Sequence, residues 1–220
     1  FASDCVVLLH GLGRTSASMY DLEKSLRQDG YIVVNNSYPS RKERIGKLSS
    51  VVGEAIEECR QENAGRIHFV AHSLGGILVR HYFQSNIVPE AKRLVMLGPP
   101  NHGSEITTLN RHKWWYRLFT GPAGQELGVE QSSIPNQLGR IPLEVGIIAG
   151  TASIDPWFSR AIAGPDDGKV SLESTKLEEM QDFITVPHSH AFMAQADDVY
   201  KQVSIFLVQG TFRHGIQASF

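Results

Sequence analysis

The stretch IHFVAHSLGG at residues 67–76 places a serine between small residues, directly after an apolar run. The apolar run suits a buried strand, and Gly76 opens a helix-compatible stretch. A serine at a sharp turn between a strand and a helix needs small residues two positions away on each side, because the backbone there closely approaches other segments. Ala71 and Gly75 meet this requirement, although glycine is usual in the first slot. The pattern predicts that Ser73 is a nucleophile beside the first amides of a helix; the alternative is a glycine turn with a solvated serine.

Strand and helix signals alternate on both sides of this stretch. Apolar runs that suit buried strands occur at residues 5–9, 31–34, 67–71, 93–97, 145–149 and 183–186. Apolar positions recur with helical spacing over residues 16–28, 44–62, 77–84 and 192–206. This alternation predicts an α/β fold with about six mostly parallel strands and helices on both faces.

The alternation breaks between residues 105 and 140. An aromatic cluster there is followed by a run rich in glycine, proline and glutamine that has no strand pattern. The cluster contains Trp114, Trp115, Tyr116, Leu118 and Phe119. Because the segment is too long for an ordinary connection, we interpret it as a cap or lid inserted above the strand ends of a single domain, residues 1–220. The alternative is that the aromatic residues only pack under a long loop.

The composition excludes several classes of protein. The chain has 220 residues and a net charge of -2, which argues against a nucleic-acid-binding protein. Its nine histidines form no metal-binding spacing, so we expect no metal and no cofactor. No apolar run reaches the length of a membrane span, and we expect a soluble protein, cytoplasmic or secreted with its leader absent from this chain. The oligomeric state stays open.

Two cysteines, Cys5 in a strand pattern and Cys59 in a helical pattern, are either buried free thiols or one disulfide. We favour free thiols, because cysteine is readily buried as a small apolar residue.

The chemistry of Ser73 requires partners, because a neutral serine is a poor nucleophile. It needs a base, and the base needs an acid to orient it. Functional residues of such sheets gather beyond the carboxyl ends of the strands. The candidates there are Asp155, Asp166 and Asp167 for the acid, and His188 and His190 for the base. Serine, aspartate, histidine is the chain order expected for a nucleophile at such a turn, but spacing alone does not select one residue of each kind.

The loop after the first strand, His10-Gly11-Leu12-Gly13, can present a backbone N–H group to the same site. Candidate substrate-binding residues are His10, Gly11, His102, Trp114 and Trp115. For His10 and His102 we favour a packing role over a direct contact, and the same holds for His72.

Seven segments together carry a family resemblance. They are VVLLHGLGR (6–14), VAHSLGG (70–76), GPPNHGSE (98–105), GPAGQELG (121–128), IAGTASIDP (148–156), GPDDGKVSLEST (164–175) and VPHSHAFM (186–193). In this order they resemble the serine lipases and esterases of the α/β-hydrolase family, in particular small bacterial triacylglycerol lipases and GPI-inositol-deacylase-like lipases. The resemblance implies a compact α/β-hydrolase fold.

The resemblance also selects residues. The acid of the family pattern immediately precedes a glycine, which matches Asp167, and the base precedes a small residue and Phe-Met, which matches His190. The backbone N–H groups of Leu12 and Leu74 match the oxyanion hole. The calcium-binding residues of larger lipases have no match here, so the resemblance implies no metal.

These observations predict a carboxylic-ester hydrolase that cleaves acyl esters or acylglycerols through a Ser-His-Asp triad and an acyl-enzyme intermediate. The expected partner is a small-molecule acyl ester or lipid, with transient contact at a lipid interface and none with nucleic acid. A thioesterase or acyltransferase with the same triad is the near alternative. A non-catalytic binding module is the alternative from another class.

Overall fold

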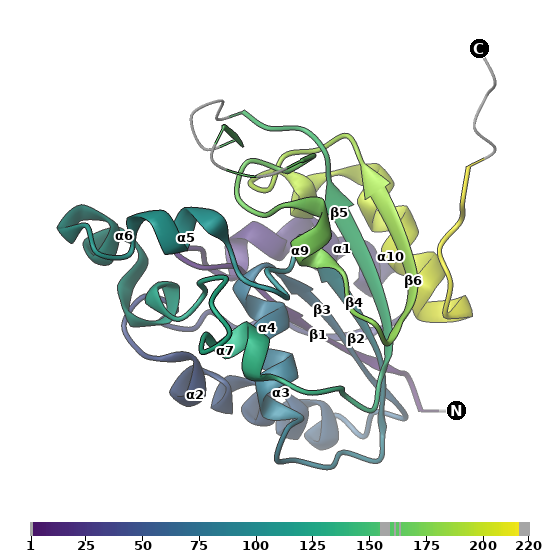
Figure 1. The fold of residues 1–220 in the computed structure, drawn as a ribbon. Coiled ribbons are helices and arrows are strands. Elements are labelled where there is room, and N and C mark those ends of the chain that lie inside the picture. The colour runs from purple at the N-terminus through teal and green to yellow at the C-terminus, as the bar shows by residue number, and fades with distance from the viewer. Residues whose placement is uncertain (1, 155–158, 161, 163, 216–220) are drawn as a thin grey trace.

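A computed structural model describes residues 2–154, 159–160, 162 and 164–215, and its centre is a six-stranded sheet (Figure 1). The strands are β1 (Cys5–Leu9), β2 (Ile32–Val34), β3 (Ile67–His72), β4 (Ala91–Leu97), β5 (Glu144–Gly150) and β6 (Met180–Val186). Their order is β2-β1-β3-β4-β5-β6, and every neighbouring pair is parallel. The predicted α/β fold class is therefore confirmed, and β3, which leads into Ser73, lies inside the sheet.

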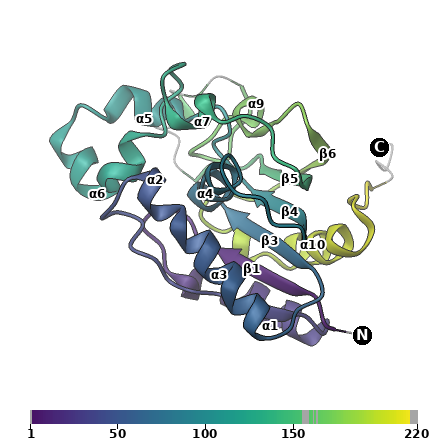
Figure 2. The same ribbon diagram turned by 90° about the horizontal axis from the view of Figure 1, so that it is seen from below.

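Helices cover both faces of the sheet (Figures 1 and 2). They are η1 (Ser16–Met19), α1 (Tyr20–Gln28), α2 (Ile45–Leu48), α3 (Ser50–Gln61), α4 (Leu74–Tyr82), α9 (Leu172–Thr175), η2 (Met193–Gln195) and α10 (Asp197–Gln209). Alternate residues of β1 point to opposite faces, so Val7 joins the apolar core under α3 and α4, whereas Val6 and Leu8 join the core under α1 and α10. Burial on both faces explains why the inner strands read as continuous apolar runs.

Element boundaries differ from the predicted ones where burial is incomplete. β6 begins at Met180 rather than at residue 183. It is an edge strand whose residues are mostly half-buried, so a search for apolar runs misses its first residues. The predicted helix at 44–62 is divided into α2 and α3, because Ser49 separates them.

The segment at residues 105–140 contains three helices. They are α5 (Glu105–Asn110), α6 (Trp114–Gln125) and α7 (Ile134–Gln137), and Figure 1 shows α6 at the left edge of the molecule. α6 is kinked at Gly121, whose φ of 64° lies outside the helical range. The aromatic residues therefore lie on a helix rather than under an irregular loop.

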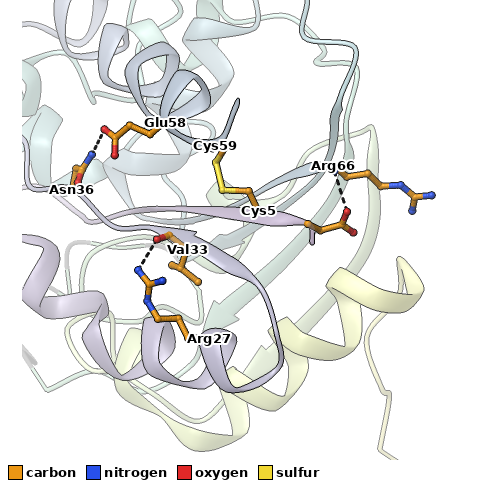
Figure 3. The surroundings of a disulfide bond; sticks show 8 residues. Cys5, Arg27, Val33, Asn36, Glu58, Cys59 and Arg66 are labelled. Carbon is orange, nitrogen blue, oxygen red and sulfur yellow. Dashed lines mark hydrogen bonds between the residues drawn. A yellow bond between two sulfur atoms is a disulfide. The ribbon is translucent and has the colours of Figure 1, made fainter. Parts of the chain in front are cut away.

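Cys5 and Cys59 form a disulfide that joins β1 to α3 (Figure 3). Our prediction of two free thiols is wrong. Both residues are fully buried, and the packing of α3 on β1 brings their Cα atoms to 5.9 Å, a separation that a disulfide requires. The two residues are 54 positions apart in the sequence, so their proximity depends on tertiary packing.

Among the described helices, none has both the length and the hydrophobicity needed to cross a lipid bilayer.

Candidate active site

Ser73 occupies the sharp turn between β3 and α4. Its backbone has φ 53° and ψ -119°, a conformation that costs a non-glycine residue free energy and is concentrated at functional sites. A Cβ atom at Gly75 would lie 2.6 Å from the carbonyl oxygen of Leu9, so only glycine fits there. Close approach of the backbone thus explains the small residue at position 75, as the sequence suggested.

His190 lies in the loop after β6 and contacts Ser73 with one ring nitrogen. Its Nε2 atom is 2.9 Å from Ser73 Oγ, and its Nδ1 atom is 2.7 Å from Asp167 Oδ2. Because a carboxylate only accepts, Nδ1–H donates to Asp167, and Nε2 is left to accept the Ser73 hydroxyl proton. The three side chains form one continuous chain of hydrogen bonds.

Asp167 is held ionised although it is 1% exposed. Burial works to raise its pKa, but the His190 charge, the His190 hydrogen bond and two backbone donors together lower the pKa below its ordinary value. The two donors are the N–H groups of Lys169 and Val170, which are 3.0 and 2.9 Å from Oδ1. Both carboxylate oxygens are therefore fixed, and so is the plane of the His190 ring.

Two of the competing candidates, Asp166 and His188, bond to other partners. Asp166 Oδ1 accepts the N–H of Gly168 at 2.7 Å and so shapes its own loop. His188 Nε2 is 2.7 Å from Asp198 Oδ1 on α10. Asp155, the remaining candidate for the acid, lies outside the described residues.

Leu74 directly follows Ser73, and Leu12 lines the same cavity as Ser73. Leu12 follows β1, and Leu74 is the first residue of α4. Within the ranges that the structure describes, neither N–H group has a hydrogen-bond acceptor. Each unpaired N–H group carries a partial positive charge, and the helix dipole at the N-terminal end of α4 adds to that charge. An oxyanion beside Ser73 would therefore be stabilised.

A cavity of about 320 Å³ opens directly on Ser73 and His190. Its apolar wall includes Leu12, Ile106, Trp115, Tyr116, Leu127 and Val170. Helices α5 and α6 supply part of this wall, since Ile106 belongs to α5, and Trp115 and Tyr116 belong to α6. Such a cavity can hold an apolar chain while the polar end meets the serine.

The sequence model of the palmitoyl protein thioesterase family matches residues 5–132. The chain belongs to this family. The match includes Ser73 and the Leu12 loop, and residues 133–220 lie outside it. A search of curated proteins gives no match.

The solved structures that are similar to this chain include lipases and a carboxyl esterase. The Bacillus licheniformis lipase BlEst2 in its mature form is 20% identical, with a TM-score of 0.75 over 94% of this chain and 91% of that chain. Its propeptide form is 18% identical, with a TM-score of 0.78 over 99% of this chain and 52% of that chain. A metagenomic carboxyl esterase is 16% identical, with a TM-score of 0.67 over 86% of this chain and 65% of that chain. These likenesses confirm the α/β-hydrolase fold.

Two of the five predicted substrate-binding residues line the cavity at Ser73. They are Gly11 and Trp115. Trp114 is 76% exposed and lies outside the cavity wall, because adjacent residues of a helix point about 100° apart. His102 is exposed as well, and its Nδ1 atom lies 3.2 Å from Asn136 Oδ1.

His10, the fifth of these residues, is the first residue of the loop 10–13, which we call the Leu12 loop, and it is fully buried. Its ring stacks on Tyr38 at 3.9 Å between centroids, and its Nε2 atom accepts the Tyr38 N–H. The Tyr38 hydroxyl donates to the His10 carbonyl, and Ser40 Oγ accepts the Gly13 N–H at 2.9 Å. Sequence reasoning missed Tyr38 and Ser40, because they lie beyond β2 and reach the loop only through tertiary packing.

His72 contacts His190, the candidate base. It is buried, and its Nε2–H donates to the His190 carbonyl at 2.9 Å. Burial, aided by the nearby His190 charge, lowers the pKa of His72 to about 3, so its ring is neutral. The packing role that the sequence suggested for His10 and His72 agrees with these contacts.

The cavity wall also contains residues that sequence reasoning did not select, including Ile106, Leu127 and Val170. Their apolar character is the only signal in the sequence, and it does not distinguish a cavity wall from a core. Among the described residues, no group of three or more His, Cys, Asp or Glu side chains is placed to hold a metal ion.

Proposed function

We propose that this protein is a carboxylic-ester hydrolase with Ser73 as nucleophile, His190 as general base and Asp167 as the orienting acid. The observation that carries the proposal is the hydrogen-bonded chain from Ser73 through His190 to Asp167 at the mouth of an apolar cavity. The family and the fold support ester hydrolysis in general.

In the first step, Ser73 Oγ attacks the carbonyl carbon of the ester while His190 Nε2 takes the hydroxyl proton. Asp167 stabilises the imidazolium that forms. The carbonyl oxygen becomes an oxyanion and accepts the N–H groups of Leu12 and Leu74.

The tetrahedral intermediate then collapses. The bond to the leaving alkoxide breaks, and His190 gives its proton to that oxygen, which leaves an acyl group on Ser73. Water repeats the sequence: His190 removes its proton, the oxygen attacks the acyl carbon, and Ser73 recovers its proton as the free acid departs.

Residues 105–140 supply the cap in this proposal, as an insertion within one domain of residues 1–220. Ile106, Trp115 and Leu127 would contact the acyl chain, because they line the cavity that reaches Ser73. A longer acyl chain would then bury more apolar surface, which is worth about 0.8 kcal/mol per methylene.

The family match favours a second candidate, a thioesterase that uses the same residues on an acyl thioester. The two candidates share every step except the leaving group, which is a thiolate instead of an alkoxide.

A paired assay tests these candidates. We expect a fluorophosphonate probe to label Ser73, and p-nitrophenyl esters from acetate to palmitate to be hydrolysed. A palmitoyl thioester, compared with the oxygen ester of the same chain, ranks the two candidates. An unlabelled serine together with no turnover of any of these substrates would contradict both and leave a binding module.

We also propose that the chain works in an oxidising compartment, because structural disulfides persist there and are rare in the reducing cytosol. Alkylation of protein isolated from its source under quenching conditions should find no free thiol; two alkylated cysteines would contradict this.

A further inference from the structure

The outer side of the cap exposes a cluster of large apolar side chains. Leu109, Trp114, Leu118 and Phe119 are 58%, 76%, 70% and 63% exposed, and we call these four residues the cap patch. Trp114 and Leu118 are one helical turn apart on α6, so they share one face of it. Single exposed apolar residues are common, but four large ones on two successive helices that also line a cavity indicate an interaction surface.

Helix α6 carries part of the cap patch and part of the cavity wall on different sides. Trp115 and Tyr116 line the cavity, whereas Trp114 and Leu118 face solvent. Figures 1 and 2 both show α6 at the outer edge of the molecule, well away from the sheet. A flat partner could therefore meet the cap patch without contacting the body of the protein.

The segment that carries the cap patch is rich in cations. Residues 105–125 contain one acidic side chain, Glu105, against Arg111, Lys113 and Arg117. Arg111 pairs with Glu130 at 2.9 Å. Lys113 and Arg117 are exposed, and within the described chain neither pairs with a carboxylate.

A second basic segment adjoins α6. The backbone of Arg41 packs against Gly121, and Arg41 and Lys42 are both exposed without a carboxylate partner in the described ranges. Arg44 is nearby but is paired with Glu126 at 3.3 Å. The whole chain has a net charge of -2, so the excess of positive charge is confined to the cap and the adjoining Arg41 segment.

We propose that the cap patch docks on the surface of an anionic phospholipid bilayer. Its apolar side chains enter the boundary between headgroups and acyl chains, and Lys113, Arg117 and the Arg41 segment meet the negative headgroups. The partner is chosen by charge complementarity together with the aromatic and aliphatic character of the patch. Binding to the bilayer does not depend on the proposed function. Its role does rest on that function, because docking would bring lipid esters to the Ser73 cavity.

Sedimentation with vesicles tests the docking apart from catalysis. The protein carries Ser73→Ala, so lipid turnover cannot alter the vesicles, and the vesicles are phosphatidylcholine alone or mixed with phosphatidylglycerol. We expect binding to the mixed vesicles, weaker binding to the neutral ones, and a decrease with added salt.

Two sets of substitutions locate the contact. Trp114→Ser with Leu118→Ser should lower binding roughly tenfold or more, since apolar insertion contributes to interfacial affinity. Lys113→Gln with Arg117→Gln should lower binding to mixed vesicles roughly thirtyfold, at about 1 kcal/mol for each cation.

Matched controls lie elsewhere on the surface. Ile87→Ser and Val208→Ser remove apolar side chains that are 91% and 68% exposed, and Lys24→Gln with Lys201→Gln removes two exposed cations. None of these should change vesicle binding.

Equal binding by the cap variants and the controls would overturn the proposal. So would self-association that the Trp114 and Leu118 substitutions abolish while vesicle binding stays unchanged, because the patch would then join two copies. Turnover of a dissolved short ester by the chain with Ser73 intact is measured separately. Its absence would contradict the proposed hydrolase, whatever the vesicles show.

Discussion

Ser73 and His190 lie 117 positions apart in the chain, yet their Oγ and Nε2 atoms are 2.9 Å apart. Residues that act as one unit lose function together, so we expect Ser73→Ala and His190→Ala to lower kcat by a similar factor, on the order of 10⁴ or more. His188→Ala is the control, because His188 bonds to Asp198 instead. The measurement is kcat on a p-nitrophenyl ester, with thermal unfolding to verify the fold. A larger loss at His188 would transfer the base to that residue.

Asp167 provides a second prediction at the residue scale. Asp167→Asn should lower kcat by about 10⁴-fold, because an amide can hold the wrong tautomer of His190. Asp166→Asn should be milder for kcat, since Asp166 bonds to the Gly168 N–H within its own loop. Steady-state kinetics of the two variants decide between them. If Asp166→Asn were the more severe change, the acid would be assigned to the wrong neighbour.

His72 makes the stability of the fold depend on pH. Its pKa is lowered to about 3 in the folded chain, whereas an unfolded histidine titrates near about 6.5. Between these values the unfolded state binds more protons, so the stabilising contribution is complete above about pH 6.5 and declines as the pH falls toward 3. The slope from this residue is at most about 1.4 kcal/mol per pH unit.

His72→Gln removes this titration but keeps a side-chain N–H donor for the His190 carbonyl. Urea unfolding at a series of pH values should give a shallower acid slope for the variant. His10 and His68 also have pKa values lowered by burial, and the lowered pKa of Asp167 adds to the acid slope, so the variant should keep part of it. Identical slopes for the variant and the parent would show that His72 does not couple folding to protons.

At the scale of elements, α6 presents two different faces to two different environments. Trp115 lines the cavity and Trp114 does not. Trp115→Ser should therefore reduce turnover of dodecanoyl esters more than turnover of acetate, because only the long chain reaches the tryptophan, at about 0.8 kcal/mol per methylene lost from contact. Trp114→Ser should leave both dissolved substrates unchanged. Equal losses on the two esters would indicate damage to the fold.

The inner elements could be predicted from the sequence because their local signals agree with their environment. β1 and β3 are buried on both faces, so their apolar runs identify them directly. α6 could not be predicted, because the helical face of its aromatic run is interrupted by Gly121 and Pro122. The support of the Leu12 loop by Tyr38 was missed for another reason: the stacking on His10 joins residues whose spacing carries no pattern. Asp167 and His190 were selected by family resemblance, since spacing left neighbouring residues equally suitable.

At the scale of the whole molecule, the disulfide and the proposed site lie at opposite ends of β1. Cys5 begins that strand, and the Leu12 loop follows its end. Replacing both cysteines with alanine should lower the free energy of unfolding by about 2–4 kcal/mol, because the unfolded chain loses a cross-link across 54 positions. We expect kcat to stay within about twofold of the parent, since the site is remote from the bond. Urea unfolding and steady-state kinetics on the same samples separate the two effects, and a fall in kcat without a fall in stability would contradict this account.

The order of the strands along the chain has a consequence for synthesis. Translation delivers β1 to β4 first, and with them the Ser73 hydroxyl and the Leu12 and Leu74 amides. Asp167 and His190 emerge later, and β6, which leads to His190, is connected to the rest of the sheet through β5. A nascent chain on the ribosome thus carries its proposed nucleophile without a base. The proposed ester turnover therefore begins only after β6 has joined the sheet and His190 lies beside Ser73.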